Sequence, residues 1–162
     1  MAPLLVTCPA LGADKRIPLR HANRHVHGGE NISPPVSWSE PPPLTRSILV
    51  TIIDLHPMAR QWIHWCVSGI PPDVRELNEG ASLHPHLLPT GVTETNNSFG
   101  EPGYGGPAPP PGSGPHEYEI TVYALNGITS FKRSQMSWKE IDRLIGGMVI
   151  ASGKCVGLYE RK

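Results

Sequence analysis

The sequence has no surplus of charge of either sign, because its 14 basic residues are matched by 14 acidic ones. A basic excess is the electrostatic footprint of proteins that bind nucleic acids or anionic membrane surfaces, so neither partner is favoured. Long apolar runs are also missing, and none approaches the roughly 18 residues of a membrane-spanning helix. The first residues lack a basic stretch followed by an apolar core, so we expect no secretory signal peptide and a cytoplasmic location.

Cysteine is equally scarce. Cys8, Cys66 and Cys155 lie far apart, and this odd, scattered set favours reduced thiols over a disulfide framework or a Cys-x-x-Cys metal site. Two His-x-His pairs in loop-like segments could hold an adventitious metal, but solvated loop histidines are the favoured interpretation. These pairs are His25 with His27 and His84 with His86. We therefore expect neither a metal nor a cofactor.

Proline and glycine, in contrast, are abundant, with 19 and 17 copies among 162 residues. Such a chain forms many turns and few long helices, which favours the all-β class. The length suits one domain over residues 1–162 with a sizeable core. The apolar and β-branched patterns predict strands near 4–7, 46–54, 62–70, 92–96, 118–125 and 152–159.

One segment, 137–145, has the pattern of a helix. Ser137 and Glu140 have the spacing of a capping box, and two glycines follow the last turn. Its predicted buried stripe consists of Ile141, Leu144 and Ile145. A second short helix is predicted at 74–79.

A run rich in glycine and proline at 103–118 ends on His116 and Tyr118. Such a run cannot be helical, so it predicts a rigid rim that delivers both side chains to one face of the following strand. The strands at 46–54 and 62–70 are predicted to pair as a hairpin, which would bring Asp54 and His64 to the same place. Simple alternation in the second strand puts Trp62, His64 and Cys66 on one face and Ile63, Trp65 and Val67 on the other.

This cluster of one aspartate, two histidines and one tyrosine leaves three uses open. Two histidines and an aspartate could bind a metal, although no short-range ligand spacing supports this. Asp54, His64 and Tyr118 could act as acid–base groups of a hydrolase or lyase, but no Gly-x-Ser-x-Gly nucleophile motif is present. The third use is anion binding, with the tyrosine hydroxyl, imidazole N–H groups and loop amides as donors.

Anion binding carries an internal conflict, because an ionised Asp54 would repel a phosphate. Either Asp54 is protonated or a neighbouring histidine is charged. We therefore expect anion affinity to strengthen as the pH falls toward the usual histidine range, about 6.5.

Several segments resemble the phosphatidylethanolamine-binding protein family, also called Raf kinase inhibitor proteins, in its short prokaryotic branch. The similar segments run in order through most of the chain. They are Gly29–Trp38, Ile53–Asp54, Trp62–Trp65, Ile70–Leu77, Asn97–Gly100, Gly103–Pro107 through His116, and Gly157–Arg161. The resemblance implies an antiparallel β-sandwich with one or two short helices, one of them near the C-terminus.

The resemblance also implies a small pocket for phosphate-like anions and phospholipid head groups, without catalysis. Asp54 and His64 would line it, His116 and Tyr118 would close it, and a backbone amide near Ala108 would contact the anion. Trp62 and Pro110 would form its walls. The implied function is regulation or inhibition of a partner kinase, with inhibition of a serine protease through a surface loop as the alternative. Relatives of the short branch suggest a homodimer.

Three residues depart from the pattern of the family. His56 replaces a second aspartate, which puts one pocket wall in doubt and adds a titrating group. Glu117 stands where the family has an arginine, and strand alternation points it away from the pocket. Ala108 replaces a cysteine found in prokaryotic relatives and so removes a thiol.

Overall fold

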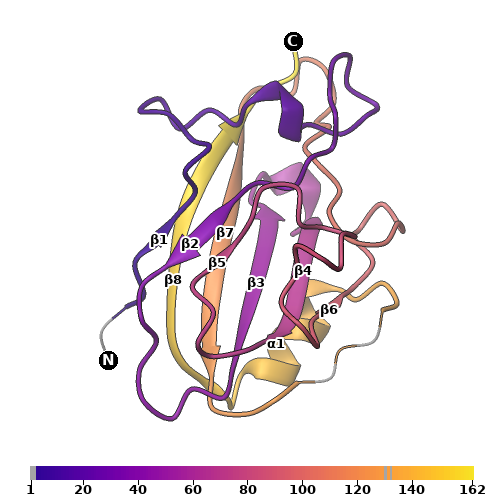
Figure 1. Cartoon of the computed structure of the whole chain (residues 1–162). Helices are drawn as coiled ribbons and strands as arrows, with labels where there is room; N and C mark the ends of the chain where they lie inside the picture. Colours follow the sequence, from indigo (N-terminus) through magenta and orange to yellow (C-terminus); the bar gives the residue numbers. More distant parts are fainter. Residues whose placement is uncertain (1–2, 130, 132) are drawn as a thin grey trace.

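The computed structural model describes residues 3–129, 131 and 133–162, and this part of the chain forms two antiparallel sheets and one α-helix (Figure 1). The larger sheet has the strand order β6-β4-β3-β7-β8. Its strands are β3 (Ser47–Asp54), β4 (Ile63–Ile70), β6 (Thr93–Glu94), β7 (His116–Leu125) and β8 (Val149–Tyr159). The smaller sheet has the order β1-β2-β5, with β1 (Val6–Thr7), β2 (Val36–Trp38) and β5 (Glu76–Leu77).

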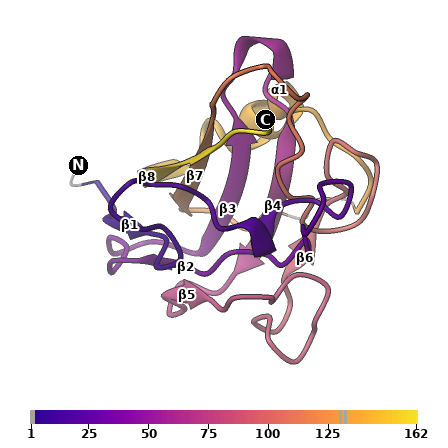
Figure 2. The same ribbon diagram turned by 90° about the horizontal axis from the view of Figure 1, so that it is seen from above.

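The larger sheet lies between the smaller sheet and helix α1 (Trp138–Ile145), as the view from above shows (Figure 2). On β3, Ile48, Val50 and Ile52 pack into the core between the two sheets. Leu49 and Ile53 face the other way, into a second core that includes two residues of α1, Ile141 and Ile145. A near-continuous apolar strand is what burial on both faces requires. The predicted all-β sandwich with a helix near the C-terminus is therefore confirmed.

The strand predictions are confirmed for six of the observed strands, with shifted ends, and the 46–54/62–70 hairpin is present as the β3–β4 pair. The helix predicted at 74–79 is wrong. Leu77 in this segment is buried and pairs with Val36, so residues 76–77 form β5. A segment this short cannot sustain a helix alone, because nucleation of a helix is costly. Strand β2 was not predicted either.

Helix α1 begins as predicted. The Ser137 hydroxyl accepts from the Glu140 amide at 3.2 Å, and the Glu140 carboxylate accepts from the Ser137 amide at 3.2 Å. Of the predicted stripe, Ile141 and Ile145 are buried, but Leu144 is 50% exposed. The two buried residues are four apart and form one line along a two-turn helix, which is all that the sheet can cover.

Two short 3₁₀ helices connect the strands, η1 (Leu19–His21) and η2 (Pro57–Ala59). Helix η2 follows β3 directly and lies at the upper end of the large sheet in Figure 1, where β3 ends and β7 begins. Within the described residues, no helix has the length and apolar character needed to cross a membrane.

Candidate functional site

A pocket of about 350 Å³ opens at this end of the large sheet. All seven residues that the sequence analysis assigned to a site line it: Asp54, Trp62, His64, Ala108, Pro110, His116 and Tyr118. The remaining lining residues are Met58, Ala59, Phe99 and Pro109. The strands account for this convergence, because Asp54 at the end of β3 is the direct partner of Tyr118 on β7.

His64 reaches the pocket through a β-bulge in β4. Ile52 pairs with Trp65, but the next residue, Ile53, pairs with Ile63, so His64 has no partner on β3. An extra residue of this kind bends a strand and redirects its side chains. Trp65 then packs between the sheets while Ile63 packs with the residues of α1. The alternation that grouped Ile63 with Trp65 on one face is therefore wrong.

The His64 ring is buried and fixed in one tautomer. Its Nδ1 lies 2.6 Å from the Gly105 carbonyl oxygen, which can only accept, so Nδ1 carries the proton. Burial is the largest influence on this ring and lowers its pKa to about 4. At neutral pH the other ring nitrogen, Nε2, is therefore an acceptor. The ring meets Tyr118 and Phe99 edge to face, with centroids 5.1 and 5.7 Å away.

Asp54 and His116 form a buried pair. Nδ1 of His116 lies 2.7 Å from Oδ2 of Asp54, and the His56 amide donates to Oδ1 at 2.9 Å. On the other side of the ring, Nε2 of His116 lies 2.9 Å from the Ser113 hydroxyl. The same hydroxyl lies 2.7 Å from the Pro110 carbonyl oxygen, so its single proton can serve either partner.

The buried pair changes the charge conflict expected at Asp54. Asp54 is not an isolated carboxylate, because His116 and the His56 amide are both hydrogen-bonded to it. The same bonds change the expected roles of the histidines. Both nitrogens of His116 are used within the protein, and neutral His64 cannot donate from Nε2, so neither ring offers an N–H to a ligand.

The donors that remain are Tyr118 and the backbone at Ala108. The Tyr118 hydroxyl is buried, and although the Asp54 carboxylate lies close to it, no atom of the described residues has hydrogen-bond geometry with it. Burial first, and then the nearby Asp54 carboxylate, raise the pKa of Tyr118, so it stays protonated and can donate. In the run Pro107–Pro111 only Ala108 has an amide proton, and it donates to no atom of the described chain.

The loop that carries Ala108 is held rigidly against the segment 21–31. The Gly106 amide donates to the Asn31 side chain at 2.7 Å, and the Asn23 amide donates to the Pro107 carbonyl at 3.0 Å. A Cβ atom at Gly106 would lie 2.1 Å from the carbonyl oxygen of His21, so only glycine allows this approach. The observed loop has the rim position that its composition predicted.

His56, which replaces an aspartate of the family pattern, does not line the pocket. It is the N-cap of η2, where its Nδ1 accepts from the Met58 amide at 3.2 Å. Its ring stacks on His116 with centroids 4.0 Å apart and planes 12° from parallel. His56 therefore supports His116 from outside the pocket. Glu117 is exposed, as strand alternation predicted.

Sequence reasoning missed Ser113 and Phe99. Ser113 lies three residues before His116 in the glycine- and proline-rich run, so its proximity could have been inferred. Phe99 comes from the loop after β6 and packs edge to face on Trp62, with centroids 5.3 Å apart. No local pattern indicates that this loop meets the β3–β4 hairpin.

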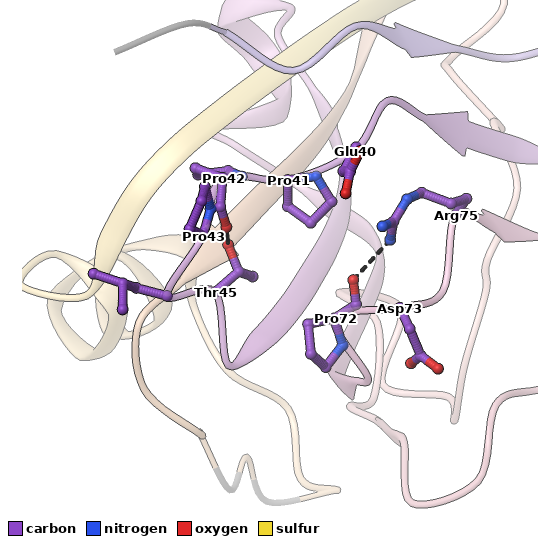
Figure 3. A pocket seen from close by; sticks show the side chains of 9 residues that line it. Glu40, Pro41, Pro42, Pro43, Thr45, Pro72, Asp73 and Arg75 are labelled. Carbon is purple, nitrogen blue, oxygen red and sulfur yellow. Dashed lines mark hydrogen bonds between the residues drawn. The ribbon is translucent and has the colours of Figure 1, made fainter.

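A second hollow, of about 670 Å³, lies between residues 40–45 and 72–75 and lacks such a set of groups (Figure 3). None of its lining residues is buried. Arg75 donates to the Pro72 carbonyl at 2.7 Å and Thr45 to the Pro42 carbonyl at 2.6 Å, so polar atoms at its rim are used internally.

The histidine pairs in the loops also gather no further ligands. Within the described residues, no group of three or more histidine, cysteine, aspartate or glutamate side chains is arranged to hold a metal ion. His25 and His27 are exposed, and the rings of His84 and His86 meet edge to face with centroids 5.8 Å apart.

Comparison with known proteins gives one consistent family. The profile of the phosphatidylethanolamine-binding protein family matches residues 8–160. A UPF0098 protein of Methanothermobacter thermautotrophicus is 35% identical over 142 residues, which cover 88% of this chain and 91% of the relative. The UPF0098 protein YbhB of Escherichia coli is 40% identical over 113 residues, covering 68% of this chain and 71% of YbhB.

Solved structures agree with the sequence matches. Escherichia coli YbcL, described as a new member of the mammalian PEBP family, superposes with a TM-score of 0.89 at 32% identity over 99% of this chain and all of YbcL. The homologue CT736 of Chlamydia trachomatis, described as a putative phosphatidylethanolamine-binding protein homologue, gives a TM-score of 0.79 at 28% identity over the full length of both chains.

Proposed function

This chain belongs to the phosphatidylethanolamine-binding protein family, and from that premise we propose that it is a non-catalytic binding protein whose pocket holds phosphate or a phosphate ester. The observation that carries the proposal is the buried Tyr118 hydroxyl, which has no hydrogen-bond partner among the described residues. Leaving a buried polar group unpaired costs free energy of about 1–3 kcal/mol, so a ligand that accepts from it is favoured.

The surroundings of Tyr118 suit an anion oxygen. The Ala108 amide supplies a second donor, and Trp62 and Pro110 belong to the apolar part of the pocket wall. The oxygens of Asp54 are already hydrogen-bonded to His116 and to the His56 amide. Two donors in a partly enclosed pocket, where water screens weakly, can hydrogen-bond to the oxygens of a phosphate.

Calorimetric titration with phenyl phosphate tests this function. Tyr118→Phe removes the donor and keeps the ring, so we expect the affinity to fall by about 10-fold or more. Tyr123→Phe is the matched control, because it makes the same change on the other face of β7 and should bind like the native protein. Equal affinity in all three proteins, or no binding by the native protein, would contradict the proposal.

For the physiological role we propose regulation of a partner protein, with a kinase as the class implied by the family resemblance. Large apolar side chains are exposed around η2 at the mouth of the pocket, with Met58 52% and Trp62 37% exposed. They would give a protein partner an apolar contact next to the bound anion. Met58→Gln, which removes apolar surface without adding a charge beside the anion, should weaken the partner complex more than it weakens phenyl phosphate binding, whereas an equal loss of both would argue against separate roles.

Hydrolysis is the second candidate function, because the structure contains an ordered Ser113–His116–Asp54 series. Its distances of 2.9 and 2.7 Å match a nucleophile, a base and an orienting carboxylate. Two observations favour binding instead: Ser113 donates to the Pro110 carbonyl, and it does not line the pocket. Covalent labelling of Ser113 by a fluorophosphonate, or ester turnover that Ser113→Ala abolishes, would establish the hydrolase and overturn the binding-only function.

A further inference from the structure

The His64 ring presents a fixed acceptor to the pocket. Its Nδ1 donates to the Gly105 carbonyl at 2.6 Å, and the Gly105 amide donates back to the His64 carbonyl at 2.8 Å. Rotating the ring by half a turn would lose the first of these bonds, and the edge-to-face contacts with Tyr118 and Phe99 restrict the ring further. The lone pair of Nε2 is therefore built into the site.

The titratable groups that face this ring do not cause Nε2 of His64 to be protonated near neutral pH. They are Asp54 from β3, and His116 and Tyr118 from β7. The charge of Asp54 raises the pKa of His64, but Asp54 is already paired with His116. Burial has the larger effect and holds the pKa of His64 at about 4. His56 lies beyond His116, on which it stacks.

The pocket therefore offers two kinds of group at once. Tyr118 and the Ala108 amide donate, and His64 Nε2 accepts. An anion that bears only acceptor oxygens can satisfy the first two but not the third. Building on the proposed phosphate binding, we infer that this pocket selects anions that carry a proton, with the P–O–H group of a phosphate donating to Nε2 of His64.

A sulfate ester lacks the proton that this arrangement requires. Phenyl sulfate has nearly the same shape as phenyl phosphate and the same single negative charge as its monoanion, but no O–H. In the pocket, one of its oxygens would face the lone pair of His64 Nε2 with no hydrogen between them. A site built to accept from a ligand hydroxyl rejects an analogue without it, because the buried acceptor is left unpaired.

If the pocket selects the protonated ester, the pH dependence of the affinity should follow the titration of the ligand. A phosphate monoester loses its second proton at a pH of about 6. Above that pH the protonated form becomes tenfold rarer with each pH unit, so the apparent affinity should fall in proportion. Phenyl sulfate does not titrate in this range, so its weak binding should stay flat. The anion affinity should therefore still strengthen as the pH falls, as the sequence analysis predicts, but the titrating group is the ligand.

Calorimetry with the two esters at about pH 5, where both carry one charge, tests the inference. We expect phenyl phosphate to bind at least about 10-fold more tightly than phenyl sulfate. In His64→Gln the side-chain amide can donate, so the ratio should fall toward 1. Tyr118→Phe should weaken both esters and keep the ratio, because both need this donor.

The possible results distinguish selection of protonated anions from anion binding itself. Equal binding of the two esters to the native protein, or phosphate affinity that does not change between about pH 5 and 8, would overturn the selection and leave anion binding standing. Binding of neither ester would overturn both. Because these measurements use the native protein, the inference stays testable even where His64→Gln does not fold.

Discussion

At the scale of single residues, the pocket depends on a histidine that the fold keeps neutral. His64 is buried, its Nδ1 is bound to the Gly105 carbonyl, and burial lowers its pKa from 6.5 to about 4. The unfolded chain therefore takes up a proton near pH 6.5, whereas the folded protein does so only near pH 4. The stabilising contribution is fully present above pH 6.5 and is lost as the pH falls through this window.

Because of this pKa shift, the stability of the fold should decrease in acid, and His64→Gln should reduce that decrease. The free energy of unfolding should fall by about 3 kcal/mol between the two pKa values because of His64. His21, whose pKa burial also lowers, adds to the loss. Urea unfolding of His64→Gln at about pH 7 and 4.5 should show a smaller decrease than the native protein. His25→Gln, at an exposed position, should match the native decrease; an unchanged decrease in His64→Gln would contradict the assignment.

The sequence allowed most residues around the pocket to be predicted, but not the bonds they make. Histidine and tyrosine two apart on a strand had to share a face, so His116 and Tyr118 followed from alternation. Their protonation did not, because it depends on the Ser113 hydroxyl, the Pro110 carbonyl and Asp54, which come together only in the folded chain.

At the scale of elements, two irregular segments position the site. The bulge at His64 redirects one side chain out of the regular alternation of β4. The alternation of side chains in a run such as Ile63–Val67 does not indicate a bulge, so the faces of this strand were assigned wrongly. The glycine- and proline-rich loop is the second segment, and its composition did predict a rigid rim.

The fit of this loop can be tested at Gly106. A Cβ atom there would lie 2.1 Å from the His21 carbonyl oxygen and 2.7 Å from the Asn23 amide nitrogen, both on the backbone. Gly106→Ala should therefore destabilise the fold by at least about 2 kcal/mol and lower Tm by roughly 4–8 °C. Gly147→Ala, which meets nothing within 4 Å, is the control and should leave Tm nearly unchanged. Equal melting of the two variants by calorimetry would contradict the close approach.

At the scale of the whole molecule, the large sheet brings together groups that lie far apart in the chain. Asp54 and His116 are 62 residues apart, yet they meet because β3 and β7 are neighbours and Asp54 is the partner of Tyr118. The strong strands and the hairpin were predictable from apolar patterning. In the smaller sheet only β1 was predictable, because β2 and β5 are only 3 and 2 residues long and are defined by their pairing.

A crystal structure of the protein soaked in phenyl phosphate would show directly whether this end of the sandwich holds a phosphate. The phosphate group should lie within hydrogen-bond distance of the Tyr118 hydroxyl, the Ala108 amide and Nε2 of His64. A pocket without the ester, or an ester bound instead in the proline-lined hollow at residues 40–45 and 72–75, would contradict it.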